Sequence, residues 1–204
     1  MEPSDSVCTW LIVGLGNPGP EYQWTYHNLG FLVAERVAER NGIRLTRRVL
    51  GALVGEGAIS GQPVLIAKPQ TFMNLSGNSV RLLVEKYAVA SRRLVLIFDE
   101  LALEWGSLRI RPKGSAGGHH GVQDVIRGLG TKEFARVRLG IHPGHPVSDG
   151  AAFVLAPIKR AQRKELDQLL DHAAQAVESI IAEGVEKSMT KFNRRAQGAN
   201  PEEA

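Results

Sequence analysis

Short apolar runs alternate along this chain with longer segments in which apolar residues recur every three or four positions. The short runs are typical of buried strands, and the longer periodicity is typical of helices with one apolar face. We expect strands over residues 10–14, 52–58, 63–67, 93–98, 108–111 and 136–141. We expect helices from a cap at Asn28 onward and over residues 75–87, 121–129 and 159–192. Strands that alternate with helices predict an α/β fold, a layered sheet with helices packed on both of its faces.

The length of 204 residues fits one compact domain. We expect that domain to span residues 10–195, between a flexible N-terminal extension at 1–9 and a frayed polar tail at 196–204. The acidic, polar start differs from a secretory signal or a basic transit peptide, and no apolar run approaches the roughly 20 residues of a membrane-spanning helix. The single cysteine, Cys8, excludes an internal disulfide framework and fits a reducing compartment, so the cytoplasm is the expected location.

The segment from Gly14 to Gly19 matches the G-x-G-x-x-G pattern of dinucleotide-binding loops and follows a predicted strand. Pro18 and Pro20, however, remove two amide donors from the loop, and the helical pattern resumes only near Asn28. The sequence therefore disfavours a nicotinamide or flavin site. The loop instead presents Asn17 at the carboxyl end of a strand, where open α/β sheets place their ligand sites.

Asp99 directly follows the predicted strand at 93–98. If this strand and the one at 10–14 are parallel neighbours, their carboxyl ends lie at the same edge of the sheet. We therefore expect Asp99 and Asn17 to converge on one site. The alternative for Asp99 and its neighbour Glu100 is a solvated turn.

Four segments in register carry a resemblance to a known family. They are residues 14–19 with Tyr22, residues 25–30 (Thr-Tyr-His-Asn-Leu-Gly), residues 71–77 (Thr-Phe-Met-Asn-Leu-Ser-Gly) and residues 98–101 (Phe-Asp-Glu-Leu). A fifth, Gly-Gly-His-His-Gly at 117–121, is a near match. Together they resemble the bacterial-type peptidyl-tRNA hydrolase family, in order from about Trp10 to Arg194. The resemblance implies a three-layer α/β/α domain with a mixed central sheet, and hydrolysis of the ester that joins a peptide to transfer RNA.

The resemblance implies roles for the motif residues. His27 would be the catalytic base and Asp99 the carboxylate that orients it, while Asn17 would hold the reacting end of the substrate. The substrate contacts would come from the remaining motif residues: Tyr22, Phe72, Met73, Asn74 and His120. The family's members are monomers that need no metal or other cofactor, and their partner is peptidyl-tRNA.

The chemistry of an ester agrees with those roles. An ester is an activated acyl group, so a water molecule deprotonated by a base can attack it directly. Histidine suits this task because its ordinary pKa lies near 6.5, and a buried carboxylate on its other nitrogen would fix its tautomer. Simpler alternatives exist for single residues: His27 as a surface or capping residue, and Asn74 as a helix cap. The pair His119-His120 hints at a metal site, but no further cysteine or histidine completes a ligand set.

Basic residues alternate with apolar ones in two predicted strands. Arg109 and Arg111 alternate in the first, and Arg136 and Arg138 alternate in the second, so each pair is expected on one exposed side. With the net charge of +4, these arginines predict contacts to transfer RNA phosphates. Further basic residues extend the set: Lys113, Lys187, Lys191, Arg194 and Arg195. The alternative is an ordinary solvated strand face.

His120 departs from the family pattern, which has asparagine at this position. The departure leaves the role of His120 open. The family also contains relatives that bind RNA but have lost hydrolysis, so a non-catalytic RNA-binding protein is the alternative function. The presence of His27, Asp99, Asn17 and Asn74 favours the enzyme.

Overall fold

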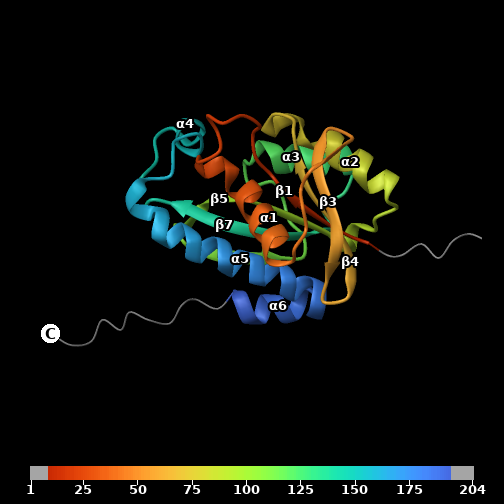
Figure 1. The fold of residues 1–204 in the computed structure, drawn as a ribbon. Coiled ribbons are helices and arrows are strands. Elements are labelled where there is room, and N and C mark those ends of the chain that lie inside the picture. Colours follow the sequence, from red (N-terminus) through yellow and green to blue (C-terminus); the bar gives the residue numbers. More distant parts are fainter. Residues whose placement is uncertain (1–8, 194–204) are drawn as a thin grey trace, which may run out of the picture.

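The computed structural model describes residues 9–193. The predicted N-terminal extension (all but its last residue), the predicted tail, and the basic residues Arg194 and Arg195 lie outside these described residues. Within them the chain forms one layered body, with the sheet running through its middle (Figure 1).

The strands between residues 9 and 193 form one seven-stranded sheet in the order β2-β3-β4-β1-β5-β7-β6. Their bounds are β1 (Trp10–Gly14), β2 (Arg47–Val49), β3 (Ala52–Ile59), β4 (Gln62–Pro69), β5 (Leu94–Glu104), β6 (Leu108–Arg111) and β7 (Ala135–His142). β4, β1, β5 and β7 are parallel, whereas β2, β3 and β6 pair antiparallel to their neighbours. The sheet is therefore mixed, and the predicted parallel pairing of the first strand with the strand at 93–98 is confirmed.

Helices cover both faces of this sheet. Their bounds are α1 (Leu29–Arg40), α2 (Ser76–Lys86), α3 (His120–Leu129), α4 (Gly150–Val154), α5 (Arg163–Glu183) and α6 (Val185–Phe192). The described residues also form short 3-10 helices of one turn each: η1 (Tyr26–Asn28), η2 (Met73–Leu75), η3 (Ser91–Arg93) and η4 (Arg160–Gln162). One core joins α1 and α5 to one sheet face, and a second core joins α2 and α3 to the other. The three-layer α/β prediction is confirmed. None of the described helices is long and apolar enough to cross a membrane.

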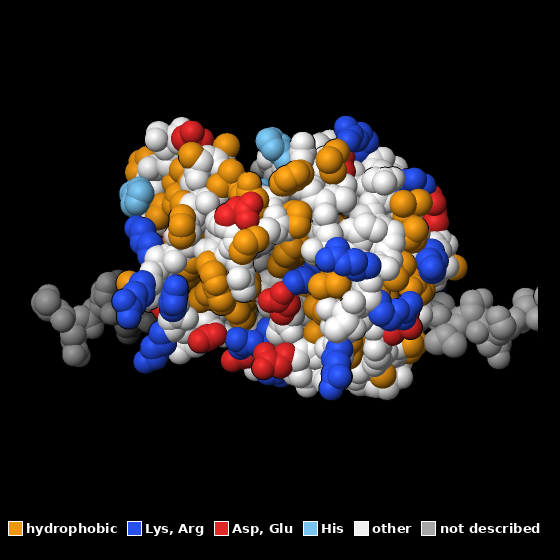
Figure 2. Space-filling model, turned by 45° about the horizontal axis from the view of Figure 1, so that its top comes forward, with side chains coloured by type: hydrophobic (Ala, Val, Ile, Leu, Met, Phe, Trp, Pro, Cys, Tyr) orange, Lys and Arg blue, Asp and Glu red, His pale blue; other side chains and the backbone are white. Residues whose placement is uncertain are grey.

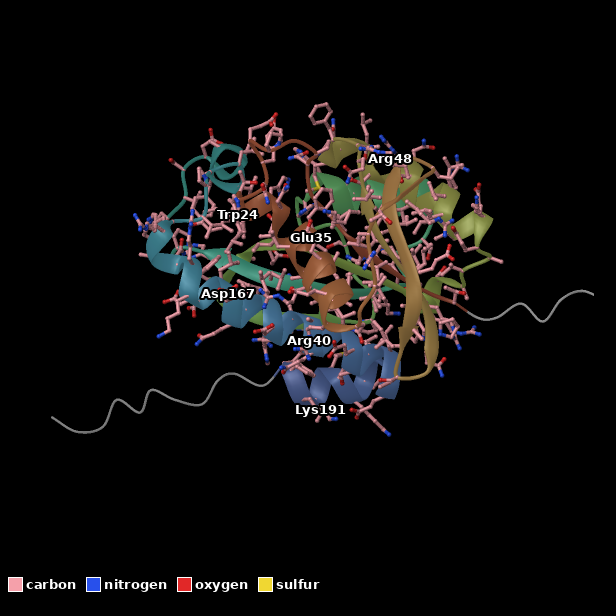
Figure 3. The ribbon with its side chains drawn as sticks, viewed as in Figure 1. Trp24, Glu35, Arg40, Arg48, Asp167 and Lys191 are labelled. Carbon is pink, nitrogen blue, oxygen red and sulfur yellow. The ribbon has the colours of Figure 1, made fainter. Side chains whose placement is uncertain are left out.

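The long C-terminal helix predicted at 159–192 is interrupted. Its apolar stripe is buried from Leu166 to Ile180, as its periodicity predicts. The chain turns at Gly184, whose φ of 89° lies in the left-handed region that glycine adopts without strain, and α6 begins after it. Ion pairs also join α1 to α5. Figure 3 shows Arg40 of α1 beside α5, where it pairs with Glu178.

The strand that carries Asp99 is longer than predicted. β5 does not end at Phe98 but continues to Glu104, with an irregular pairing to β7 between Glu100 and Glu104. Its other neighbour, β1, stops at Gly14, which pairs with Ile97. Because β1 ends there, the side chain of Asp99 meets η1 instead of a neighbouring strand.

The first turn of α1 packs directly against the ends of these two strands. A Cβ atom placed on Gly30 would lie 2.4 Å from the carbonyl oxygen of Ile97 and 2.5 Å from the amide nitrogen of Leu15. Real Cβ atoms do not approach backbone this closely, so only glycine permits this contact. The contact holds η1, just before α1, at the carboxyl ends of β1 and β5.

Replacing Gly30 with alanine should lower the free energy of unfolding by about 3 kcal/mol, or prevent folding, because backbone atoms cannot rotate away from the added methyl group. Urea denaturation followed by circular dichroism measures this. Gly150→Ala is the control: its nearest neighbour, a methyl group of Leu101 at 3.2 Å, can move. The control should change stability by less than about 1 kcal/mol. A Gly30→Ala protein as stable as the parent would contradict the packing.

Candidate active site

A cavity of about 580 Å³ opens at the carboxyl ends of β1 and β5. Its walls come from the loop after β1, η1, η2, the start of α3, and α4. Figure 2 shows apolar side chains gathered on both sides of a hollow at the upper edge of the molecule. Eight of the predicted site residues line the cavity: Asn17, Tyr22, His27, Phe72, Met73, Asn74, Asp99 and His120.

The centre of the cavity is a carboxylate between two imidazole rings. Nδ1 of His27 lies 2.9 Å from Oδ1 and 3.0 Å from Oδ2 of Asp99. Nε2 of His119 lies 3.1 Å from the same Oδ1. The centroids of the two imidazole rings are 4.8 Å apart, and the His119 ring makes a T-shaped contact with the Phe98 ring, with 5.1 Å between their centroids. Asp99 therefore accepts hydrogen bonds from both histidines.

These contacts assign the tautomers of both histidines. The backbone amide of Val122 donates to Nδ1 of His119, so the ring proton of neutral His119 is on Nε2, facing Asp99. His27 donates from Nδ1 to the same carboxylate. Nε2 of His27 makes no hydrogen bond within residues 9–193, and in this tautomer it carries a lone pair. His27 is thus arranged as a base.

Asp99 is ionised although it is only 2% exposed. Burial by itself raises the pKa of Asp99, but the attraction of His119 and His27, together with their hydrogen bonds, outweighs burial and holds that pKa well below the usual carboxyl range. The alternative of a solvated turn is therefore wrong for both Asp99 and Glu100, since Glu100 is only 7% exposed.

Asn17 is held by hydrogen bonds on three sides. Its backbone amide donates to Oδ1 of Asn28 (2.8 Å), and its carbonyl accepts from Nδ2 of Asn28 (2.9 Å). Its side-chain Oδ1 accepts from the amide of Met73 at 2.8 Å. Because Oδ1 is used, the Nδ2 group of Asn17 is the part of the amide that remains for a ligand. Asn28 begins α1 as predicted, but its side chain clamps Asn17 and makes no cap bond.

The remaining cavity residues form its rim. Phe72 is 57% exposed and Tyr22 is half-buried. Asn74 lies exposed within η2, and the helix that follows has Leu75 as its N-cap, so the capping alternative for Asn74 is wrong. His120 is the first residue of α3 and lies exposed at the cavity wall.

The arginines do not lie in the cavity, and the expectation of two exposed pairs is wrong in part. Arg109 pairs with Arg138, and Arg111 with Arg136, across the antiparallel β6–β7 ladder, so all four share one sheet face. Arg109 and Arg111 are half-buried there.

Arg136 is only 2% exposed. Its guanidinium lies over the Phe134 ring and donates to the carbonyl oxygens of Ser115 and Lys132. Burial, with the nearby Arg138, lowers the pKa of Arg136 to about 10, so it stays charged at neutral pH. Arg138 is half-buried and ion-paired with Glu100. Tertiary packing therefore removes Arg136 from the surface that was predicted for it.

Of the basic residues predicted near the C-terminus, the two that the structure describes, Lys187 and Lys191, belong to α6. Lys191 of α6 pairs with Glu183 (2.5 Å), and α6 is on the side of the molecule opposite α3 and α4 (Figure 1).

Sequence reasoning missed three contributors to the site. The motifs at 117–121 and 98–101 contain His119 and Glu100, but the sequence assigns neither residue a role in the site, and it does not predict α4. The motif at 117–121 contained the signal for His119, but nothing local indicates its pairing with Asp99. The helix α4 has only five residues, so it shows little periodicity. Its sequence signal is the N-cap Asp149, whose side chain accepts a hydrogen bond from the amide of Ala152.

His27, Asp99 and His119 could also hold a cation, since their ligand atoms lie within 4.8 Å of one another. Binding a metal would require both histidines to give up the protons that they donate to Asp99. The observed N···O distances of 2.9–3.1 Å are those of hydrogen bonds. The geometry therefore fits a hydrogen-bonded triad.

Comparison with known proteins agrees with this arrangement. The family model described as Peptidyl-tRNA hydrolase matches residues 11–200. The chain is 60% identical over 195 residues to a peptidyl-tRNA hydrolase of Solibacter usitatus, covering 96% of this chain and 100% of that protein. It is 50% identical over 188 residues to that of Koribacter versatilis, covering 92% and 94% respectively. The crystal structure of peptidyl-tRNA hydrolase from Acinetobacter baumannii matches with a TM-score of 0.84 at 34% identity, covering 94% of this chain and 97% of that one.

The depressed pKa of Asp99 predicts a pH-dependent effect of Asp99→Asn. A carboxyl whose folded pKa is below its unfolded value of about 3.9 contributes stability above that pH and loses it as pH falls through the folded pKa. Asp99→Asn should therefore be less stable than the parent by roughly 2 kcal/mol at pH 7, with the gap narrowing below about pH 4. Urea unfolding of the parent and the variant at pH 7 and below about pH 4 measures this difference in the free energy of unfolding. Asp167→Asn, at an exposed ion pair, is the control and should show a small gap throughout. A constant gap for Asp99→Asn would contradict the argument.

Proposed function

Since the chain belongs to the peptidyl-tRNA hydrolase family, we propose that it hydrolyses the ester bond of peptidyl-tRNA with His27 as general base and Asp99 as its orienting carboxylate. The observation that carries this is the His27–Asp99 pair, with Nδ1 bound to a buried carboxylate and Nε2 left as the free nitrogen. Nε2 takes a proton from a water molecule as the water attacks the ester carbonyl. The ionised Asp99 then stabilises the imidazolium that forms.

Asn17 supplies the donor for the carbonyl oxygen. Negative charge develops on this oxygen during attack, and preorganised N–H donors stabilise it. The Nδ2 group of Asn17 is fixed in orientation because Met73 and Asn28 hold the rest of the residue. Asn74, exposed at the rim, provides a second amide for the peptide or the ester.

His119 acts through Asp99 as a positioning residue. It donates to Oδ1 of Asp99, and its ring is in turn held by the amide of Val122. This arrangement leaves Asp99 one orientation in which both histidine contacts are satisfied.

The rim receives the terminal nucleotide and the peptide. Tyr22 and the exposed ring of Phe72 offer aromatic faces on which an unpaired base can stack. Neutral His120 offers one donor and one acceptor, as an asparagine amide does, so it can replace the family's asparagine.

Arg109 and Arg111 bind phosphates of the transfer RNA outside the cavity. They share the β6–β7 face with Arg138, whose partner Glu100 lines the cavity, so this basic face begins at the cavity wall. Phosphate contacts position a nucleic acid without reading its sequence, which suits an enzyme that accepts many transfer RNAs.

We place the enzyme in the cytoplasm as a monomer, where peptidyl-tRNA released from ribosomes is its substrate.

His27→Ala tests the proposed activity. The variant should lose turnover of peptidyl-tRNA by about 100-fold or more, because the general base is gone, while it still folds and binds. Release of peptide from labelled peptidyl-tRNA measures turnover, and binding of an inert analogue measures affinity. His145→Ala, at an exposed loop position, is the control. Near-normal turnover in His27→Ala would exclude this mechanism, and a parent protein that binds but never hydrolyses would favour the non-catalytic alternative.

Arg109→Ala tests the basic face. The variant should bind full-length substrate more weakly, with the slope of log affinity against log salt reduced by roughly 0.7–0.9 for the lost phosphate contact. A short substrate that carries only the terminal nucleotides and the peptide should be cut as before. Equal loss with both substrates would show that Arg109 is structural.

A further inference from the structure

A side chain completes the outer edge of the sheet next to the arginines of β6. β6 lies at one end of the strand order, and within residues 9–193 it pairs only with β7. The amide of Asn193 binds its other edge. Oδ1 of Asn193 accepts from the backbone amide of Ile110 at 2.7 Å, and Nδ2 donates to the carbonyl oxygen of Ile110 at 3.0 Å. Asn193 thus makes the two hydrogen bonds that a residue of a further strand would make.

Ile110 stands between the two arginines that bind phosphates in the proposed function. Backbone groups of successive strand residues point to opposite edges, so those of Arg109 and Arg111 face β7 while those of Ile110 face Asn193. The Ile110 side chain is buried in the core on the α5 side, and the two arginine side chains lie on the other face of the strand. Asn193 and β7 therefore hold this three-residue segment from both edges.

β6 needs this support because its charges weaken the ladder. The strand has only four residues, and the register places Arg109 opposite Arg138 and Arg111 opposite Arg136. Like charges directly opposite each other destabilise an antiparallel pair. Within residues 9–193 the ion pairs nearby belong to Lys113 and Arg138, and neither includes Arg109 or Arg111. The uncharged amide of Asn193 stabilises the strand without neutralising the two arginines.

The position of Asn193 is set by the packing of α6. Asn193 is the C-cap of this helix, and its backbone amide donates to the carbonyl oxygen of Met189 at 2.9 Å. The ring of Phe192 meets the ring of His172 in α5, with 5.1 Å between their centroids. α6 is thus fixed to α5, and its last turn delivers Asn193 to the edge of β6.

We propose that Asn193 is a positioning residue for transfer RNA: by completing the outer edge of β6, it holds Arg109 and Arg111 in place for the phosphates. This inference rests on the proposed function and adds to it a residue that itself contacts no phosphate. It gives α6, which lies away from the cavity wall, a part in substrate binding.

Asn193→Ala tests this role with an inert full-length analogue of peptidyl-tRNA. If β6 is ordered in only about one fifth of the variant molecules, the Kd of the analogue should rise about fivefold. The slope of log affinity against log salt should stay that of the parent, because the bound state keeps its phosphate contacts. Arg109→Ala, by contrast, should lower this slope. A short substrate with only the terminal nucleotides and the peptide should keep its kcat and KM.

Two controls separate positioning from a general loss of stability. Asn41→Ala is the matched control, since Asn41 also ends a helix, α1, but its side chain binds Val37 and Glu178. It should leave the Kd of the analogue unchanged. Adding Asn193→Ala to an Arg109→Ala/Arg111→Ala protein should weaken binding by less than about 1.5-fold, because the order of β6 no longer matters without the arginines.

Hydrogen exchange of the parent tests the same coupling without a variant, so it decides the question if Asn193→Ala fails to fold. A contact that favours binding must itself be favoured by binding. The Ile110 amide should therefore exchange more slowly in the presence of the analogue, as measured by NMR, while amides of the β3–β4 pair change little. Equal exchange of the Ile110 amide with and without the analogue would contradict the inference.

Two results with Asn193→Ala would overturn it: parent affinity for the full-length analogue, or an equal loss with the short substrate. Failure of the parent itself to cut either the short or the full-length substrate would instead overturn the proposed function, so the two failures are distinguishable.

Discussion

The contact between the first turn of α1 and the ends of β1 and β5 determines where the His27–Asp99 pair lies. Gly30 allows the helix backbone to touch Leu15 and Ile97, with no side chain between them. Because β1 stops at Gly14 while β5 continues, the segment that enters α1 comes to lie against Asp99. This close approach places Nδ1 of His27 within 3.0 Å of the carboxylate. The rest of the site is built around that pair.

The site stabilises several buried polar groups by giving each one a partner. Asp99 is shared by two imidazoles, Asn17 is clamped by Asn28 and Met73, and Glu100 is bound by Arg138. Each partner comes from a different element from the group that it binds, so the groups fix one another's orientation as well as compensating their burial. Such preorganisation suits ester hydrolysis, in which the protein must already be arranged for the charge that appears in the transition state.

Local patterns predicted most of the framework, and they failed where packing overrode them. The strands at 108–111 and 136–141 and the stripe of α5 follow from residue periodicity, and they are confirmed. Strand alternation also predicted an exposed Arg136, but the loop at Ser115 and the ring of Phe134 cover this side chain. The predicted end of β5 was wrong because pairing with β7 continues beyond the apolar run. The motifs predicted eight of the residues that line the cavity. No local sequence pattern, however, indicates that His119 pairs with Asp99.

The sequence by itself determined the order of most strands and helices, though not β2 or α4, together with the family resemblance and the residue types that could perform the chemistry. These depend on periodicity and on motifs, which a linear chain displays directly. Only the tertiary structure decided which polar groups are buried and which residues they pair with. Asp99 pairs with His27 and His119, and Glu100 pairs with Arg138. Burial and pairing arise between segments that are far apart along the chain, and neither composition nor spacing encodes the distance between them.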